Sequence, residues 1–87
     1  MQLGQVVYSK QGRDKGSPFV VVKIQSDKVF LTDGNLRKIH KPKKKNLKHI
    51  HKTKHIHKGL QQALLQNTYI KDSDVRSALK MFVSNES

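Results

Sequence analysis

The part of this 87-residue chain with the most evident chemistry is a long cationic segment. Residues 34–71 contain eleven Lys or Arg residues and all five histidines but no carboxylate, and the chain has a formal net charge of +12. Lysines that neutralise phosphates release condensed counterions, which gives strong, salt-sensitive and largely sequence-independent attraction. We therefore expect a polyanionic partner, with nucleic acid as the leading class. The candidate contacts here are Arg37, Lys38, Lys41, Lys43, Lys44, Lys45 and Lys48.

The alternative interpretation of this segment is a solvated basic face or a disordered tail. A run of like charge without interleaved carboxylates lacks the ion pairs that would make such a face harmless, which favours binding. If on the order of six phosphates are neutralised, affinity should fall by roughly 10³ between about 50 and 200 mM salt.

A second cationic group is the glycine-flanked loop formed by Gly12, Arg13, Asp14, Lys15 and Gly16. Glycine permits sharp reversal of the backbone and close approach to a ligand, while Arg13 can bind two phosphate oxygens and Lys15 adds a point charge. The alternative is an ordinary hairpin loop with solvated charges. The spacing and the Lys-Ser/Thr ending of a Walker loop are missing.

The histidines include two His-x-His pairs, His49 with His51 and His55 with His57, and His40 stands apart. Residues two positions apart on a strand point to the same face, so the imidazoles of each pair could bind one zinc or nickel ion. The neighbouring lysines would repel a divalent cation, and no cysteine or nearby carboxylate completes a ligand set. We therefore expect no metal or other cofactor, and interpret the histidines as phosphate donors that gain charge below pH ~6.5 and tighten binding on acidification.

Other residue types argue against catalysis and against sequence-specific recognition. The six carboxylates fall mostly in predicted turns or at a helix start, and no serine lies in a nucleophile motif, so we do not expect an enzyme. There is no tryptophan, and most of the aromatic residues sit in apolar patterns typical of a core. Tyr8 is the one aromatic residue considered for base stacking. RNA shape and phosphate geometry are the expected features recognised.

Residues 6–8, 19–24 and 28–32 are β-branched and aromatic runs bounded by turn residues, which predicts three strands in an antiparallel meander. Residues 36–39 could add a fourth strand before Pro42 breaks pairing, and residues 46–51 a fifth that closes a small barrel. This basic, mainly β part forms the first predicted unit, residues 1–52.

Beyond Thr53 the apolar residues recur at helical spacing, which predicts a helical extension over residues 53–87. One short helix carries Ile56, Leu60, Ala63 and Leu64, and a second carries Val75, Ala78, Leu79 and Phe82. Asp72 or Ser73 can cap the second helix, and Asp74 suits its N-terminal dipole. We expect this extension to pack on the barrel or on the partner.

Three stretches of the chain follow a known pattern. The first contains Gly4, Val6, Val7, Tyr8, Ser9, Lys10, Gly12, Arg13, Asp14, Lys15, Gly16, Phe19, Val20, Val21 and Val22. The second contains Asp33, Gly34, Asn35, Leu36, Arg37, Lys38, Lys41, Pro42, Lys43, Lys44 and Lys45, and the third contains Asp74, Val75, Arg76 and Leu79. Together they resemble a KOW motif, particularly its variant in the eukaryotic and archaeal large-subunit ribosomal protein family numbered fourteen.

The resemblance implies an SH3-like β-barrel, a KOW domain, whose partner is ribosomal RNA. It places Gly16 at the central glycine of the motif and Arg13 and Lys15 in the RNA-facing loop, with Lys10 leading into it. Phe19 stands where general KOW domains often carry a second glycine, which argues against transcription-factor-type behaviour more than against ribosomal-type behaviour. A bacterial ribosome-associated homologue also fits this pattern.

The expected function is therefore a non-catalytic, RNA-binding, ribosomal or ribosome-associated protein that contacts ribosomal RNA of the large subunit, with ribosomal proteins as further partners. The alternatives are a nucleoid or transcription-associated KOW protein, and an adaptor that binds a protein through the barrel or the second helix. The sequence contains no run long enough for a membrane span and no secretory signal, so a soluble, cytoplasmic protein without a membrane partner is expected.

Overall fold

The first three strands form an antiparallel meander in the computed structural model, which describes residues 1–86 and side chains as far as Asn85. They are β1 (Gln5–Ser9), β2 (Pro18–Gln25) and β3 (Lys28–Thr32). The three predicted strands are confirmed, and β3 has the predicted bounds. The tight turn between β2 and β3 includes Ser26, whose φ is 54°.

The other two strands differ in position from the prediction, and the predicted fifth strand, residues 46–51, shares only Ile50 and His51 with the observed last strand. β4 (Lys43–Asn46) pairs with β3, and β5 (Ile50–Ile56) pairs with β1, which gives the antiparallel order β4-β3-β2-β1-β5. A short 3₁₀ helix, η1 (Leu47–His49), joins them. The prediction of a strand at residues 36–39 is wrong, because these residues belong to a turn whose backbone groups bond within the loop and to side chains.

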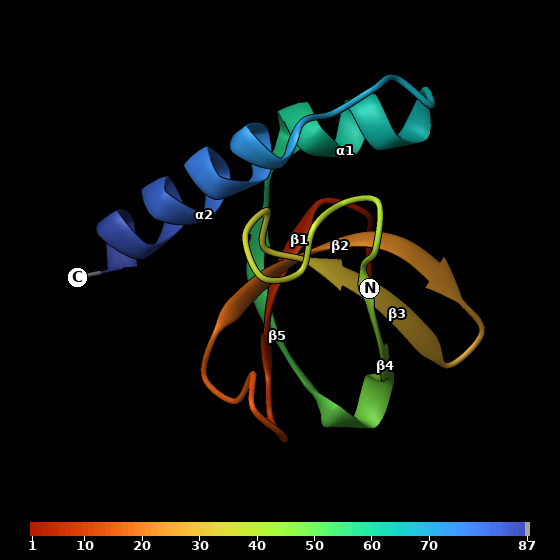
Figure 1. The fold of residues 1–87 in the computed structure, drawn as a ribbon, viewed down its shortest axis with the longest axis vertical. Coiled ribbons are helices and arrows are strands. Elements are labelled where there is room, and N and C mark those ends of the chain that lie inside the picture. The colour runs from red at the N-terminus through yellow and green to blue at the C-terminus, as the bar shows by residue number, and fades with distance from the viewer. Residues whose placement is uncertain (87) are drawn as a thin grey trace.

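The sheet curves strongly but stays open (Figure 1). β4 and β5 are its two edges, so the prediction that the fifth strand closes a barrel is wrong. The physical reason is local: η1 turns the chain away from β4, and β5 then forms its ladder with the free edge of β1. Lysines are concentrated on both edge strands, a composition that discourages edge-to-edge association.

Adjacent valines on β1 and β2 face two different cores. Val6 and Val20 contact the helices, whereas Val7 and Val21 face the concave side of the sheet with Phe19, Val29, Leu31 and Ile50. Successive strand residues point to opposite faces, so a continuous apolar run is what a strand buried on both sides requires.

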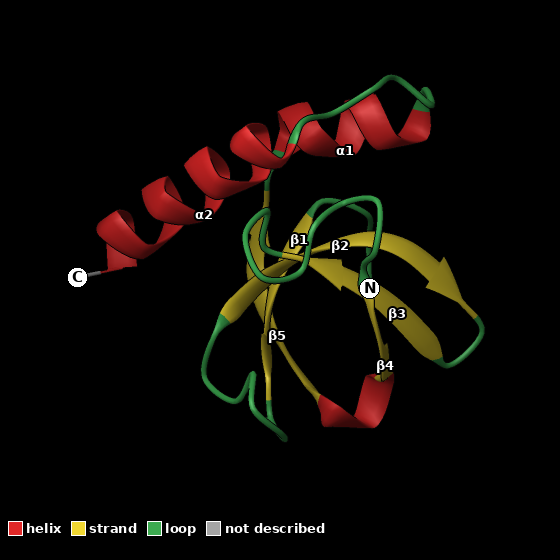
Figure 2. Ribbon diagram, in the orientation of Figure 1, coloured by secondary structure: helices red, strands yellow, loops and turns green. Residues whose placement is uncertain are grey.

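The helical extension covers one side of the sheet (Figure 2). It consists of α1 (Lys58–Leu65) and α2 (Asp72–Glu86), which confirms two helices. Ile56, expected in the first helix, is instead the last residue of β5, where it pairs with Gln5 of β1. Leu60 of α1 and the predicted apolar face of α2, consisting of Val75, Ala78, Leu79 and Phe82, are buried against Val6 and Val20. The extension therefore packs on the β part of the chain as expected, although that part is an open sheet and not the predicted barrel. β5 continues four residues beyond the predicted boundary at residue 52.

Both helices begin with side-chain hydrogen bonds. Nδ1 of His57 accepts the Leu60 N–H of α1 at 3.1 Å. At α2, Oδ2 of Asp74 accepts the Lys71 N–H at 3.0 Å, in agreement with the predicted place of Asp74 at the N-terminus. The prediction for Asp72 differs, because its Oδ1 accepts the backbone N–H of Ile39 instead of capping the helix.

Candidate nucleic-acid interface

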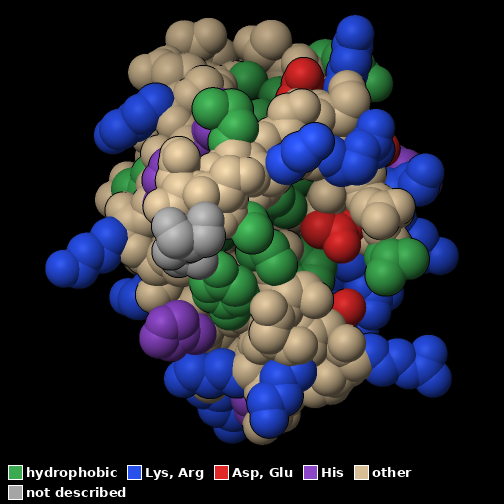
Figure 3. Space-filling model, turned by 90° about the vertical axis from the view of Figure 1, so that its left-hand side faces the viewer, with side chains coloured by type: hydrophobic (Ala, Val, Ile, Leu, Met, Phe, Trp, Pro, Cys, Tyr) green, Lys and Arg blue, Asp and Glu red, His purple; other side chains and the backbone are tan. Residues whose placement is uncertain are grey.

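Lysine and arginine side chains project around the outline of the molecule, and carboxylates are few (Figure 3). Most of the predicted contact residues are available to a partner. Lys10, Arg13, Lys15, Lys38, Lys41, Lys44 and Lys48 are exposed, whereas Arg37, Lys43 and Lys45 are half-buried.

Five of the predicted residues line one hollow of about 520 Å³, formed by the connection between β3 and β4 and by the first residues of β4. We call it the cationic hollow. Its lining consists of Leu36, Arg37, Lys38, His40, Lys41, Pro42, Lys43 and Lys44. None of these residues is acidic, so their positive charges add within one concave surface, and concave surfaces focus the electrostatic potential.

The loop between β1 and β2 has the backbone geometry that its glycines predict. Gly12 and Gly16 have φ of +81° and +82°. An added Cβ would have no close neighbour at Gly16 and only Nζ of Lys45 at 3.6 Å beside Gly12. Both positions therefore require glycine for its φ and not for lack of space. The loop is compact, because Gly16 N–H donates to Ser9 O at 3.0 Å and Ser17 N–H donates to Asp14 O at 3.0 Å.

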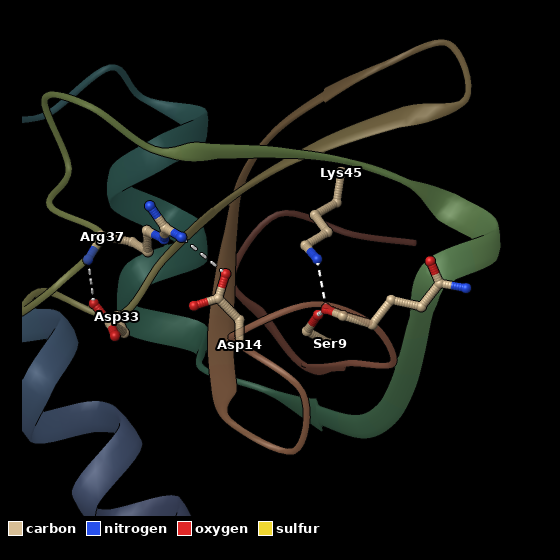
Figure 4. Close-up of polar contacts among 6 residues, drawn as sticks. Ser9, Asp14, Asp33, Arg37 and Lys45 are labelled. Atoms are coloured by element: carbon tan, nitrogen blue, oxygen red, sulfur yellow. Dashed lines mark hydrogen bonds and ion pairs between the residues drawn. The ribbon is translucent and has the colours of Figure 1, made fainter.

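Asp14 joins this loop to the cationic hollow. Its side chain is 10% exposed, and its Oδ2 lies 3.1 Å from Nη2 of Arg37, 23 residues away in the sequence (Figure 4). One N–H edge of the Arg37 guanidinium therefore binds the protein itself. Sequence reasoning treated Asp14 as turn chemistry and Arg37 as a free phosphate contact. The detectable signal was a single carboxylate, Asp14, inside an otherwise cationic loop.

Lys45 forms a second link across the open side of the sheet. Its Nζ donates to the backbone carbonyl of Gln11 at 2.9 Å, so β4 is tied to the tip of the β1–β2 loop (Figure 4). Arg13 and Lys15 are therefore held beside the segment that carries Arg37 and Lys43. These two contacts bring together in space the two cationic groups that were predicted separately from the sequence.

The turn that carries the cationic hollow is closed by its own backbone. The carbonyl of Arg37 accepts hydrogen bonds from the Thr32 hydroxyl and from the N–H groups of Asp33 and Gly34. Oδ1 of Asp33 accepts the N–H groups of Asn35 and Arg37 at 2.9 and 2.8 Å. Asp33 is therefore an Asx-turn residue, and the turn has a defined shape without a partner.

Helix α2 holds the same turn from the other side. Nη1 of Arg76 donates to the Gly34 carbonyl at 2.6 Å, and Asp72 accepts the Ile39 N–H at 2.8 Å. Gly34 has φ of +74°, and a Cβ built there would lie 2.3 Å from the Asp72 carbonyl oxygen. Only glycine allows this approach, so the second helix positions the cationic hollow.

Some aromatic residues are buried in the core as predicted, and others are not. Phe19 and Phe82 are buried, as expected, but Tyr69 is 81% exposed. Phe30 is half-buried on the outer face of β3, with Nζ of Lys23 and Nζ of Lys44 lying 5.2 and 5.9 Å from its ring centroid. Tyr8, considered for stacking, is half-buried with its ring centroid 6.2 Å from that of Phe82.

The histidines are spread over several elements. His40 lines the cationic hollow, His57 caps α1, and the His55 ring centroid lies 5.1 Å from that of Phe82. Within the described part of the chain, no three His, Asp or Glu side chains gather where they could hold one metal ion.

A scan against protein-family models found no match for this chain, and a search of the curated proteins found none either. None of the helices within residues 1–86 combines the length and the apolar character needed to cross a bilayer. Inference about function therefore depends on the geometry and charge of the residues themselves.

Proposed function

We propose that this chain is a non-catalytic RNA-binding protein of the KOW type that docks on ribosomal RNA of the large subunit in the cytoplasm. The observation that carries the proposal is that hydrogen bonds connect the β1–β2 loop to the segment that lines the cationic hollow and continues into β4. Two ties, Asp14 to Arg37 and Gln11 to Lys45, connect cations that are more than twenty residues apart in the sequence. A surface of this kind fits the phosphates of a folded RNA.

The proposed SH3-like relationship is supported by three features of the fold. The strand order is β4-β3-β2-β1-β5, a 3₁₀ helix precedes the last strand, and that strand pairs with the first. The glycine-flanked loop with Arg13 and Lys15 lies between β1 and β2, where the KOW resemblance requires it. The Nζ of Lys45 on β4 donates to the Gln11 carbonyl of this loop, so the loop is also tied to β4.

The structure disfavours an adaptor that binds its protein partner through the apolar face of α2. The apolar face of α2 that would have bound a protein is buried against the sheet, with Val75 fully buried and Phe82 6% exposed. A protein partner of this face would have to displace the helix. The proposal of a nucleoid or transcription-associated protein differs only in the nucleic acid bound, and direct competition decides between the two.

The test is sedimentation of a cell lysate through sucrose gradients of graded salt, with the protein followed across the free and ribosomal fractions. Retention on the large subunit at high salt supports a ribosomal protein, and release at moderate salt supports a transient ribosome-associated factor. A pool that stays free or DNA-bound at every salt concentration contradicts ribosomal docking. Competition of folded RNA against duplex DNA for the purified protein then identifies the preferred nucleic acid.

A further inference from the structure

The lining of the cationic hollow is not purely cationic. Leu36 is 82% exposed, more than any other large hydrophobic residue in the described chain, and Pro42 and the His40 ring lie in the same lining. A phosphate site needs only donors and positive charge, so it leaves an exposed leucine unexplained. A lining that combines cations with apolar and ring surfaces is suited to a ligand that has both an anionic and a flat apolar part.

The exposure of Leu36 is fixed by the fold. Leu36 lies between Asn35 and Arg37, whose N–H groups are both bound by the Asp33 carboxylate. Gly34, two residues earlier, is held by Arg76 and packed against the backbone of α2. The leucine therefore projects from a turn that is anchored on both sides, and a preorganised contact loses little entropy when a ligand binds.

The size of the hollow limits what it can hold. About 520 Å³ lies within the range of sites for small organic ligands, and it is far too small for a helical duplex. A paired RNA strand presents mainly phosphates, sugars and base edges, whereas an unpaired nucleotide also presents the face of its base. Lys38, Lys41 and Lys44 supply the charge for the flanking phosphates.

We infer that the cationic hollow binds one unpaired nucleotide of the RNA, with the base packed on Leu36, Pro42 and the His40 ring and the adjacent phosphates on the lysines. This inference rests on the proposed function and deepens it, because it gives the protein a preference for bulged or looped RNA over continuous duplex. Base recognition here is by packing, so it tolerates different bases.

The experiment compares two short RNA duplexes that differ by a single bulged 2-aminopurine nucleotide, titrated with the full-length protein. The wild-type protein should bind the bulged duplex about tenfold more tightly than the paired one, the factor that one base contact typically supplies. The 2-aminopurine emission should also change on binding. Equal affinity for both duplexes, with unchanged emission, overturns the inference while leaving RNA binding intact.

Variants locate the preference. L36S should reduce the ratio of the two affinities toward one, and L65S is the matched control, because Leu65 on α1 is also exposed, at 62%, and lies outside the hollow. A ratio that stays near ten in L36S overturns the assignment to this hollow. If the wild-type protein binds neither duplex, the proposed function fails, and if it binds both equally, only the inference fails.

Discussion

Replacing Lys38, Lys41 and Lys44 together by glutamine should weaken RNA binding and make it less sensitive to salt. All three lysines are exposed and line the cationic hollow, so each can neutralise a phosphate without first breaking a hydrogen bond to the protein. The slope of log affinity against log salt changes by about 0.9 for each phosphate contact on a duplex. Three lost contacts should make this slope shallower by about 2.7.

The same arithmetic gives the size of the effect in a simple titration. Between about 50 and 200 mM salt, each phosphate contact accounts for a loss of roughly 3.5-fold in affinity. The factor by which affinity falls over this range should therefore be about 40 times smaller for the triple variant than for the wild-type protein. Fluorescence anisotropy with a labelled RNA hairpin at five or six salt concentrations measures both slopes.

The matched control changes the same number of charges elsewhere. Lys54 on β5, Lys58 on α1 and Lys80 on α2 are also exposed and lie outside the hollow. Replacing these three by glutamine lowers the net charge equally, so it reports the contribution of overall charge. If both triple variants flatten the salt slope by the same amount, attraction is a property of the whole charged molecule and the reasoning about a localised interface is refuted.

Three further predictions concern the contacts that hold the interface, and urea unfolding measures each of them. D14N should lower the free energy of unfolding by about 1–3 kcal/mol, because it leaves the half-buried Arg37 without its carboxylate. The control, D27N at an exposed turn, should stay within about 0.5 kcal/mol of the wild type. Similar losses of stability in both variants would contradict the structural role of the ion pair. G34A should lower the free energy of unfolding by more than about 2 kcal/mol, because the new Cβ would both strain the positive φ and clash with α2. G16A has a similar φ but open space around it, so it should lose only about 1 kcal/mol. Equal losses in the two variants would show that the close approach of Gly34 to α2 is unimportant for stability. H57A should cost about 1 kcal/mol by removing the cap of α1, and no loss would argue against that hydrogen bond.

The elements most accurately predicted are those whose signal is local. Residues 28–32 alternate between the core and the outer face and are bounded by turn residues, so they were assigned without error. The two helices were found because Leu60, Val75 and Phe82 recur at helical spacing and are buried as that spacing requires. In each case the residues that define the element are also those that contact the core.

The fourth strand was misplaced because two segments compete for the same role. Residues 36–39 contain Leu36 and Ile39, which favour a strand, whereas β4 consists of three lysines and an asparagine. The decisive interactions are not encoded in propensity. Asp33 closes the turn over residues 33–37, and β4 then gains its stability from its ladder with β3, where Lys44 lies opposite Phe30. Tertiary pairing overrides a weak local preference of this kind.

The grouping of the cations could not be predicted from the sequence, because it depends on contacts over long separations. Arg37 meets Asp14 across 23 residues, and Gly34 meets Asp72 across 38. No periodicity reports such pairs. A lone carboxylate between two cations, as in Arg13-Asp14-Lys15, is a usable sign that a charged loop is anchored from within.

The placement of the carboxylates explains how a surface with so much positive charge can have a fixed shape. Clustered lysines repel one another, and nothing in the segment from residue 34 to residue 71 compensates for them locally. Asp14, Asp33 and Asp72 come from outside this segment, and all three bind its first turn: one through a guanidinium and two through backbone N–H groups. Acceptors that bind from beneath the turn hold it in place without covering the exposed lysine ammonium groups. The base of the cationic face is therefore held by these contacts while its exposed lysines stay unneutralised, a combination that suits the proposed recognition of a folded RNA by shape.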